Sequence, residues 1–319
     1  MHRDPYLVYS PIPQWHGRYT RYNALGFRGA EFPERKPPHT LRLAVLGGST
    51  AFGAFVNDEQ TFPAVLQELL QRTPARSAGH VSASHVEVIN AAGPGYVSTQ
   101  ELIALHLKVL PLTPDVVIIF DGLNDIFNFA AGRRNHATRM EEWEKQCTMT
   151  TMERTQALLH RASALVRVGG ALRWQLVQWR QHARRQQDAE PPWEPPSGAI
   201  DGTTMVYLEN LRSMLALLQA RVITAVTIFQ PARLWAMSEE EMQAATHYPL
   251  ERVRAMRSLH QTMKQGGLDI TAQFGPGFSV LDFDDMGKVP SFFIEGDDVH
   301  LTEAGHRAVA RRLADFIAM

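Results

Sequence analysis

The chain has 319 residues, of which 45% are hydrophobic, and its 32 Lys+Arg and 33 Asp+Glu leave a net charge of -1. This composition excludes a disordered or fibrous protein, and it excludes binding to nucleic acid through overall charge. The only cysteine is Cys147, which excludes an intramolecular disulfide framework and a multi-cysteine zinc site.

The start of the chain shows no targeting signal. No apolar signal-peptide core follows residues 1–5, and no apolar stretch reaches the ~20 residues needed to span a bilayer. We therefore expect a soluble, cytoplasmic protein, or an envelope-associated one if an upstream anchor was removed. Residues 1–40 are rich in Pro, Arg and Tyr and lack helical or strand periodicity, so we expect them to wrap around the domain formed by 41–319.

From residue 41 onwards, short apolar runs alternate with helical patterns. The runs that predict strands buried on both faces are 41–46, 86–90, 115–120, 222–229 and 278–283. Helices are expected at about 62–71 after the cap Thr61, behind a capping box of Ser98 and Glu101, and from Thr302 onwards. This alternation predicts an α/β fold with a parallel sheet that helices cover on both faces.

Four of the expected strands are followed by residues that can take part in chemistry. Ser49 follows the first strand, Gly95 the second, Asn124 the third and Gln230 the fourth. Ligands of parallel sheets bind outside the carboxyl ends of the strands. We therefore expect these four residues to lie along one rim of the sheet.

An insertion at about 128–203 separates the third and fourth strands and is too long for a plain crossover. Apolar residues recur in steps of four and three from Leu158 to Trp179, which predicts a helix that packs on one side. Between Arg154 and Arg185 the segment carries seven arginines and no acidic residue. We interpret the insertion as a helical cap or lid whose arginine face, 154–185, either contacts a membrane or another anionic surface or lies in water.

The stretch Gly47-Gly48-Ser49-Thr50-Ala51-Phe52-Gly53 resembles a phosphate-binding loop only superficially. Ala54 and Phe55 stand where such a loop requires Lys and Ser/Thr, and the spacing of a dinucleotide fingerprint is also missing. A serine between a strand and a turn instead has an exposed hydroxyl and a main-chain N–H that can stabilise an oxyanion. Ser49 is therefore a candidate nucleophile.

A candidate base stands near the C-terminus, just before the last expected helix. Asp297 and His300 are three residues apart, so one turn can bring carboxylate and imidazole together. Asp298 is a competing partner, although its spacing of two residues is less suitable. The alternative is that His300 only precedes a helix cap.

The glycine–serine turn, the stretch 90–96 with its two glycines, the stretch Gly122-Leu123-Asn124-Asp125 and Asp-x-x-His occur in order and resemble the four blocks of the SGNH (GDSL-like) hydrolase family. The resemblance covers about 41–128 and 203–318. It implies a flavodoxin-like three-layer α/β/α sandwich with a central, mainly parallel five-stranded sheet. It also implies that Ser49 is the nucleophile, His300 the general base and then acid, Asp297 the group that orients His300, and Ser49, Gly95 and Asn124 the oxyanion hole.

Two of the blocks depart from the family's better-known form. The first reads Gly-Gly-Ser-Thr instead of Gly-Asp-Ser-Leu, as in bacterial branches of the family, some of which are associated with acyl modification of polysaccharides. The second block offers two glycines, of which we choose Gly95 while Gly93 stays open. An α/β-hydrolase is disfavoured because Ala51 replaces the last glycine of Gly-x-Ser-x-Gly and because Ser49 follows the first strand.

Other polar and aromatic residues are assigned less specific roles. Asp125 is expected to hold its loop by hydrogen bonds, whereas Gln230 and Trp235 are expected to line the substrate pocket. No cofactor and no metal site is expected, because a serine mechanism supplies its own nucleophile.

These observations predict a serine hydrolase that cleaves carboxylic esters through an acyl-enzyme. Its substrate would be a small-molecule or glycan ester, and nucleic acid is not an expected partner. The alternatives are an O-acyltransferase that uses the same residues on a sugar or alcohol, and a non-catalytic binding module on the same fold. The sequence does not indicate an oligomeric state.

Overall fold

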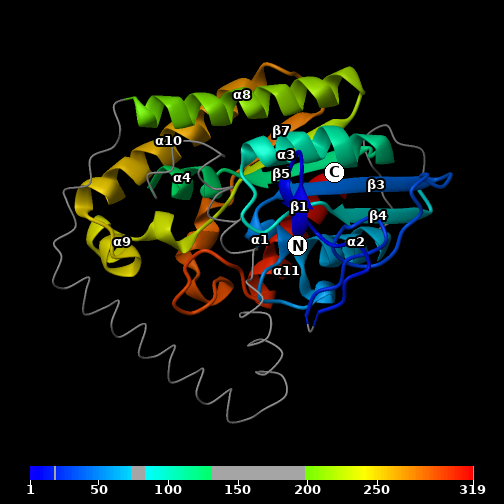
Figure 1. Cartoon of the computed structure of the whole chain (residues 1–319), viewed down its shortest axis with the longest axis horizontal. Helices are drawn as coiled ribbons and strands as arrows, with labels where there is room; N and C mark the ends of the chain where they lie inside the picture. Colours follow the sequence, from blue (N-terminus) through cyan, green and yellow to red (C-terminus); the bar gives the residue numbers. More distant parts are fainter. Residues whose placement is uncertain (18, 73–82, 131–197, 319) are drawn as a thin grey trace, which may run out of the picture. The chain divides into compact units, whose positions relative to one another are not determined.

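The computed structural model describes residues 1–17, 19–72, 83–130 and 198–318 (Figure 1). Its main sheet has the strand order β4-β3-β5-β6-β7, and every neighbouring pair is parallel. The strands are β3 (Thr40–Gly47), β4 (His85–Asn90), β5 (Val116–Asp121), β6 (Thr224–Phe229) and β7 (Phe278–Leu281). In chain order this is the flavodoxin-like arrangement 2-1-3-4-5, whose order reverses between β3 and β5. The expected fold is confirmed.

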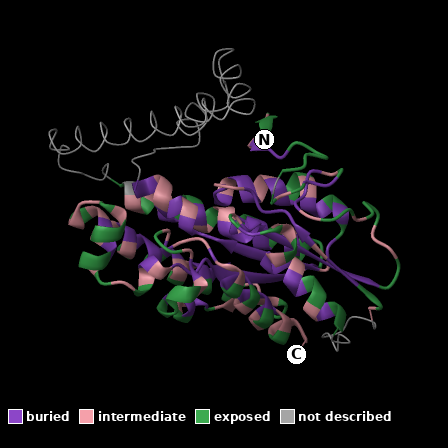
Figure 2. Cartoon of the chain, turned by 90° about the horizontal axis from the view of Figure 1, so that it is seen from below, coloured by how far each residue is buried: buried purple, intermediate pink, exposed green. Residues whose placement is uncertain are grey.

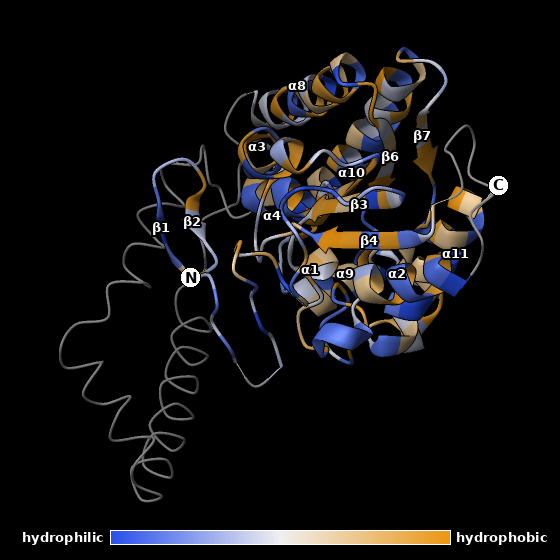
Figure 3. Cartoon of the chain, turned by 90° about the vertical axis from the view of Figure 1, so that its right-hand side faces the viewer, coloured by the Kyte–Doolittle hydropathy of each residue, from blue (hydrophilic) through white to orange (hydrophobic). Residues whose placement is uncertain are grey.

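Helices cover both faces of the sheet (Figure 3). On one face lie α2 (Phe62–Arg72) and α11 (Glu303–Ala318), which pack on each other. On the other face α8 (Ala199–Ala220) packs on α3 (Ser98–Ala104), α4 (Leu123–Ala130) and α10 (Leu250–Ala272). The shorter elements are α1 (Ser49–Phe52), α9 (Glu239–Thr246), a π-turn at Leu105–Val109, and 3-10 turns at Asp58–Gln60, Leu110–Leu112, Arg233–Ala236, Asp284–Lys288 and Pro290–Phe292.

The core lies on both sides of the sheet, which explains the unbroken apolar runs in the sequence. Every residue of β3 and β5 is buried, and the helices bury the sides that face the sheet (Figure 2). In α2 the buried residues Phe62, Val65, Leu66 and Leu70 recur at helical spacing. Burial of such side chains contributes roughly 1.5–3 kcal/mol each.

Strand β4 lies at the edge of the sheet, where unpaired main-chain N–H groups could attract another strand. Two glutamines of α2 satisfy these groups. Gln67 and Gln71 accept hydrogen bonds from the N–H groups of Val88 and Val86, both at 2.8 Å. Helix α2 therefore protects the edge strand β4 from pairing with another strand, in addition to covering one face of the sheet.

The capping box expected at Ser98 and Glu101 is wrong. Helix α3 begins at Ser98 itself, Val97 is the residue before it, and Gln100 accepts the hydrogen bond from the N–H of Val97. The Ser98 hydroxyl instead donates to Asp125 at 2.7 Å, and the Glu101 side chain is buried. Neither side chain caps the helix.

The two ends of the expected insertion, about 128–203, overlap described helices, since α4 continues to Ala130 and α8 begins at Ala199. The expected cap, its arginine face at 154–185 and Cys147 lie outside the described residues. In the part of the chain that is described, no helix has the length and apolar character of a membrane span. Residues 1–40, whose sequence shows no clear helical or strand periodicity, contain an antiparallel hairpin of β1 (His2–Asp4) and β2 (Val8–Ser10).

Candidate active site

The structure brings Ser49, His300 and Asp297 into one chain of hydrogen bonds, although 251 positions separate Ser49 from His300. Ser49 Oγ lies 2.8 Å from His300 Nε2. On the other side of the ring, His300 Nδ1 lies 2.8 Å and 2.9 Å from the two carboxylate oxygens of Asp297. The imidazole can accept the Ser49 proton while Asp297 fixes the orientation and tautomer of the ring.

Local structure determines where these three side chains lie. Ser49 is the first residue of α1, directly behind β3, at the point where the strand order of the sheet reverses. Asp297 and His300 stand on the loop before α11. Asp297 Oδ1 accepts hydrogen bonds from the main-chain N–H groups of His300 at 2.7 Å and Val299 at 3.2 Å, so the turn itself holds the carboxylate.

The electrostatics of Asp297 suit a group that stays ionised. Partial burial raises its pKa, but hydrogen bonds from the His300 side chain and from the main chain outweigh this effect, so the pKa is lowered overall. The side chains of His300 and Asp297 are 19% and 25% exposed, so the pair remains open to a substrate.

Asp298, the competing partner of the imidazole, is engaged elsewhere. Its carboxylate pairs with Arg233 at 2.6 Å, and its main-chain carbonyl accepts a hydrogen bond from the Arg233 N–H at 2.9 Å. Its backbone has a φ of +59°, which directs the residue differently from Asp297. Asp298 therefore connects the loop to the turn after β6.

Three donors lie around the carboxyl ends of β3, β4 and β5. The Ser49 N–H is at the start of α1, where helical N–H groups have no acceptor within the helix. The Asn124 amide donates one hydrogen to the carbonyl of Tyr96 at 2.7 Å and has a second hydrogen left. The N–H of Gly93 already donates to Gly47 at 3.0 Å, which leaves Gly95 as the candidate in the second block.

The turn that carries Gly95 has a defined geometry. The N–H of Tyr96 donates to the carbonyl of Gly93 at 3.0 Å, with Pro94 and Gly95 between them. Gly95 has a φ of +74°, the conformation that the third position of a type II turn requires of glycine. A side chain at this position would be strained.

The N-terminal segment supports both sides of the site, which the sequence did not indicate. The buried guanidinium of Arg28 donates to the carbonyls of Phe52 at 2.8 Å and Gly53 at 2.7 Å, just behind Ser49. The Tyr9 hydroxyl donates to the carbonyl of Pro94 at 2.6 Å, next to Gly95. These contacts could not be predicted, because polar side chains in a segment without periodicity do not indicate which groups they will bind.

A buried cluster of carboxyl groups lies behind Asn124. Asp125 accepts from the hydroxyl of Ser98 at 2.7 Å and from its N–H at 3.1 Å, which is the hydrogen-bonding role expected for this residue. Asp121 accepts from the Tyr207 hydroxyl at 2.9 Å, and the buried carboxyl group of Glu101 is close enough to interact with it electrostatically.

The carboxyl groups of Asp121 and Glu101 cannot both be ionised in this environment. Burial, together with the charge of Asp125, raises the pKa of Asp121 to about 7. Burial and the neighbouring Asp121 also raise the pKa of Glu101 well above its usual value. Both shifts favour the protonated form of the pair over the doubly ionised one.

The two residues expected to line the substrate pocket have other contacts. Gln230 is only 3% exposed and donates to the Thr50 hydroxyl at 2.8 Å, so it fixes the residue next to Ser49. Trp235 stacks on His260 of α10, with the ring centroids 4.2 Å apart. Gln230 therefore supports the site from below the surface, and Trp235 packs against α10.

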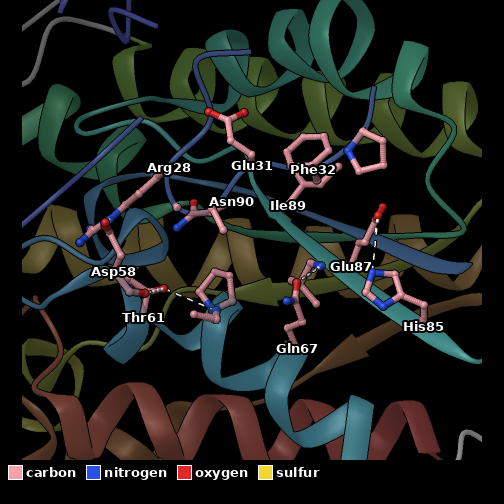
Figure 4. A pocket seen from close by; sticks show the side chains of 16 residues that line it. Arg28, Glu31, Phe32, Asp58, Thr61, Gln67, His85, Glu87, Ile89 and Asn90 are labelled. Atoms are coloured by element: carbon pink, nitrogen blue, oxygen red, sulfur yellow. Dashed lines mark hydrogen bonds and ion pairs between the residues drawn. The ribbon is translucent and has the colours of Figure 1, made fainter. Parts of the chain in front are cut away.

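A hollow of about 260 Å³ lies between residues 28–33, α2 and β4 (Figure 4). Ser49, Asp297 and His300 are not among its lining residues. Its polar side chains pair with one another or with the main chain, as in Arg28 with Asp58 at 2.8 Å and Gln67 with Val88. This hollow is therefore separate from the candidate active site.

The chain matches a known protein family. The sequence model of the GDSL-like Lipase/Acylhydrolase family matches residues 45–308. Among solved structures, the lipase/acylhydrolase from Enterococcus faecalis is similar, with a TM-score of 0.47 and 14% identity over 87% of this chain and 95% of that one. An acetylxylan esterase from Geobacillus stearothermophilus has a TM-score of 0.47 and 16% identity over 87% of this chain and 94% of its own. A search of curated proteins found no match. Because the family match spans most of the sequence, the chain belongs to the GDSL-like lipase/acylhydrolase family of hydrolases.

Proposed function

We propose that this protein is a serine esterase that cleaves carboxylic esters through an acyl-enzyme on Ser49. The observation that carries the proposal is the hydrogen-bonded chain from Ser49 through His300 to Asp297, with contacts of 2.8 Å at both ring nitrogens. Its position at the carboxyl ends of β3 and β5 adds support, because ligands bind at such switch points.

In the first half of the reaction, Ser49 Oγ attacks the carbonyl carbon of the ester while His300 Nε2 takes the hydroxyl proton. The carbonyl oxygen becomes negatively charged and accepts hydrogen bonds from Ser49 N–H, Gly95 N–H and the second amide hydrogen of Asn124. The bond to the alcohol oxygen then breaks, His300 returns the proton to that oxygen, and the alcohol leaves.

In the second half, a water molecule attacks the acyl carbon and gives one proton to His300. The bond to Ser49 Oγ breaks, His300 returns the proton to Ser49, and the carboxylic acid leaves. Asp297 stays ionised throughout and stabilises the imidazolium that forms twice in each cycle.

Turnover of p-nitrophenyl esters tests this proposal. Ser49→Ala is expected to lose activity to near the background rate while it keeps the unfolding midpoint of the native protein. Unchanged turnover by folded Ser49→Ala protein would contradict the proposal. Adding a sugar or simple alcohol separates hydrolysis from acyl transfer, because a transferase would divert the acyl group to the acceptor in place of water.

A further inference from the structure

Phe55 is an exposed aromatic residue beside the proposed catalytic histidine. Its side chain is 72% exposed, more than any other large aromatic side chain in the described part of the chain. The ring centroid lies 5.1 Å from that of His300, at an interplanar angle of 77°. An apolar ring in water next to a reactive group offers a surface to which an apolar part of a substrate can bind.

The backbone of Phe55 is also in an unfavourable conformation. Its φ is +72°, in the left-handed region that bulky residues rarely adopt. Burial gives no compensation, because the side chain is mostly in water. Strained residues of this kind occur where the surrounding structure fixes them, and they are concentrated at binding and active sites.

The surrounding loop does fix Phe55. Arg28 donates to the carbonyls of Phe52 and Gly53 on one side, and to the carbonyl of Val56 at 2.7 Å on the other. The residues on both sides of Phe55 are therefore held by one buried guanidinium. Its ring is presented beside His300 by a preorganised loop.

The neighbourhood of His300 indicates which part of an ester would meet this ring. In the proposed reaction the acyl carbon is bonded to Ser49 and its oxygen faces the donors at Gly95 and Asn124. The alcohol oxygen must approach His300, which returns the proton to it. The remainder of the alcohol therefore lies beside the imidazole.

We propose that Phe55 is a specificity-determining residue that binds the alcohol part of the ester and favours alcohols with an apolar face. This inference rests on the proposed esterase function. We therefore expect the enzyme's preference among alcohols to depend on Phe55. Its preference among acyl groups should not depend on Phe55.

Two series of esters test the inference. In one series the acyl group is acetyl and the alcohol is methyl, butyl or benzyl alcohol; in the other the alcohol is ethanol and the acyl chain grows. For Phe55→Gly, kcat/KM of benzyl acetate is expected to fall about tenfold more than that of methyl acetate, mainly through KM, because the apolar contact is lost. Phe55→Leu, which keeps apolar bulk, should lie in between, and the acyl-length profile should keep its shape.

Val222→Gly provides a matched control. Val222 is 93% exposed, has a φ of +58°, and stands before β6, at the opposite end of the strands from Ser49. Glycine relieves the same backbone strain at both positions, so both variants should unfold at a temperature no lower than the native protein. Only Phe55→Gly should change the preference for the alcohol.

Three results would overturn the inference. A changed acyl-length profile in Phe55→Gly would mean that Phe55 contacts the acyl group. An equal loss of kcat for all esters would mean that Phe55 acts through His300. Unchanged kinetics would mean that Phe55 has no role in substrate binding. If the native protein turned over no ester and Ser49 did not react with a fluorophosphonate, the proposed function itself would fail. A reactive Ser49 with unaltered alcohol preference in Phe55→Gly would refute this inference alone.

Discussion

A Cβ atom on Gly48 would lie 2.2 Å from the amide nitrogen of Asn124, closer than any non-bonded contact allows. The backbone of Gly48 is extended, so space and not a special φ requires glycine here. The family's better-known first block has Asp at this position. In this chain a side chain at position 48 would meet the Asn124 amide, so the amide would have to move to make room for it.

Gly48→Ala is therefore expected to displace the Asn124 amide from the oxyanion. Loss of one such donor corresponds to about 2.7–4 kcal/mol of transition-state stabilisation, so kcat should fall about 10²–10³-fold. The measurement is kcat on a p-nitrophenyl ester, together with the unfolding midpoint. Asn124→Ala should show a similar loss, and adding it to Gly48→Ala should cause little further loss. Full activity of Gly48→Ala would show that Asn124 does not act as a donor.

Asp297→Asn should lower kcat by roughly 10³–10⁴-fold, because an amide no longer fixes the imidazole in the tautomer that accepts the Ser49 proton. Asp298→Asn is the matched control. It loses the ion pair with Arg233 but leaves both contacts between Asp297 and His300 in place. Its kcat should change far less. An equal loss in the two variants would mean that the ion pair, and not the contact with the imidazole, supports activity.

Tyr9→Phe tests whether the N-terminal segment supports the turn that carries Gly95. The variant removes the hydrogen bond to Pro94 and should reduce the free energy of unfolding by about 1 kcal/mol. We also expect a several-fold loss of kcat with little change in KM, because the turn supplies a donor to the transition state. Tyr6→Phe is the control, since Tyr6 is 67% exposed. Loss of stability without loss of kcat would limit Tyr9 to a structural role.

The buried carboxyl pair makes stability depend on pH. The pKa of Asp121 is about 7 in the folded protein, above its usual value of 3.8, so the folded state holds a proton that the unfolded state releases between these values. The protonated Asp121 therefore stabilises the folded state fully below about pH 4. This stabilisation is lost as the pH rises to about 7. His260 has the opposite dependence, because burial lowers its pKa to about 4.

Comparison with Asp121→Asn isolates the effect of the carboxyl group. The amide can still accept from Tyr207 but cannot ionise, so the variant should gain stability relative to the native protein as the pH rises from 5 to 8. Urea unfolding at several pH values measures the difference. A difference that stays constant over this range would show that Asp121 is not protonated in the folded state.

Much of the fold was predictable because strands buried on both faces form continuous apolar runs, as in 41–46 and 115–120. The position of Ser49, Gly95 and Asn124 at one edge of the sheet was predictable because parallel strands end at the same edge. The spacing of Ser98 and Glu101 matches a local capping box, but the Ser98 hydroxyl donates to the distant Asp125 and the Glu101 side chain is buried.

The contacts of the N-terminal segment could not be predicted from periodicity. Arg28 and Tyr9 bind main-chain carbonyls, and a carbonyl acceptor is the same at every position of a sequence. The same limit applied to Gln230, whose place after β6 was recognised but whose partner, the Thr50 hydroxyl, was not. In the sequence Phe55 only excludes a phosphate-binding loop, because no sequence pattern marks an exposed ring beside a distant histidine.

The most direct test of the central claim is covalent labelling by a fluorophosphonate, followed by intact-mass measurement and peptide mapping. We expect one adduct per chain, located on Ser49, and none on folded Ser49→Ala. We also expect much slower labelling of His300→Ala, because the hydroxyl of Ser49 then lacks its base. Labelling of another residue, or no labelling of the folded native protein, would contradict the account.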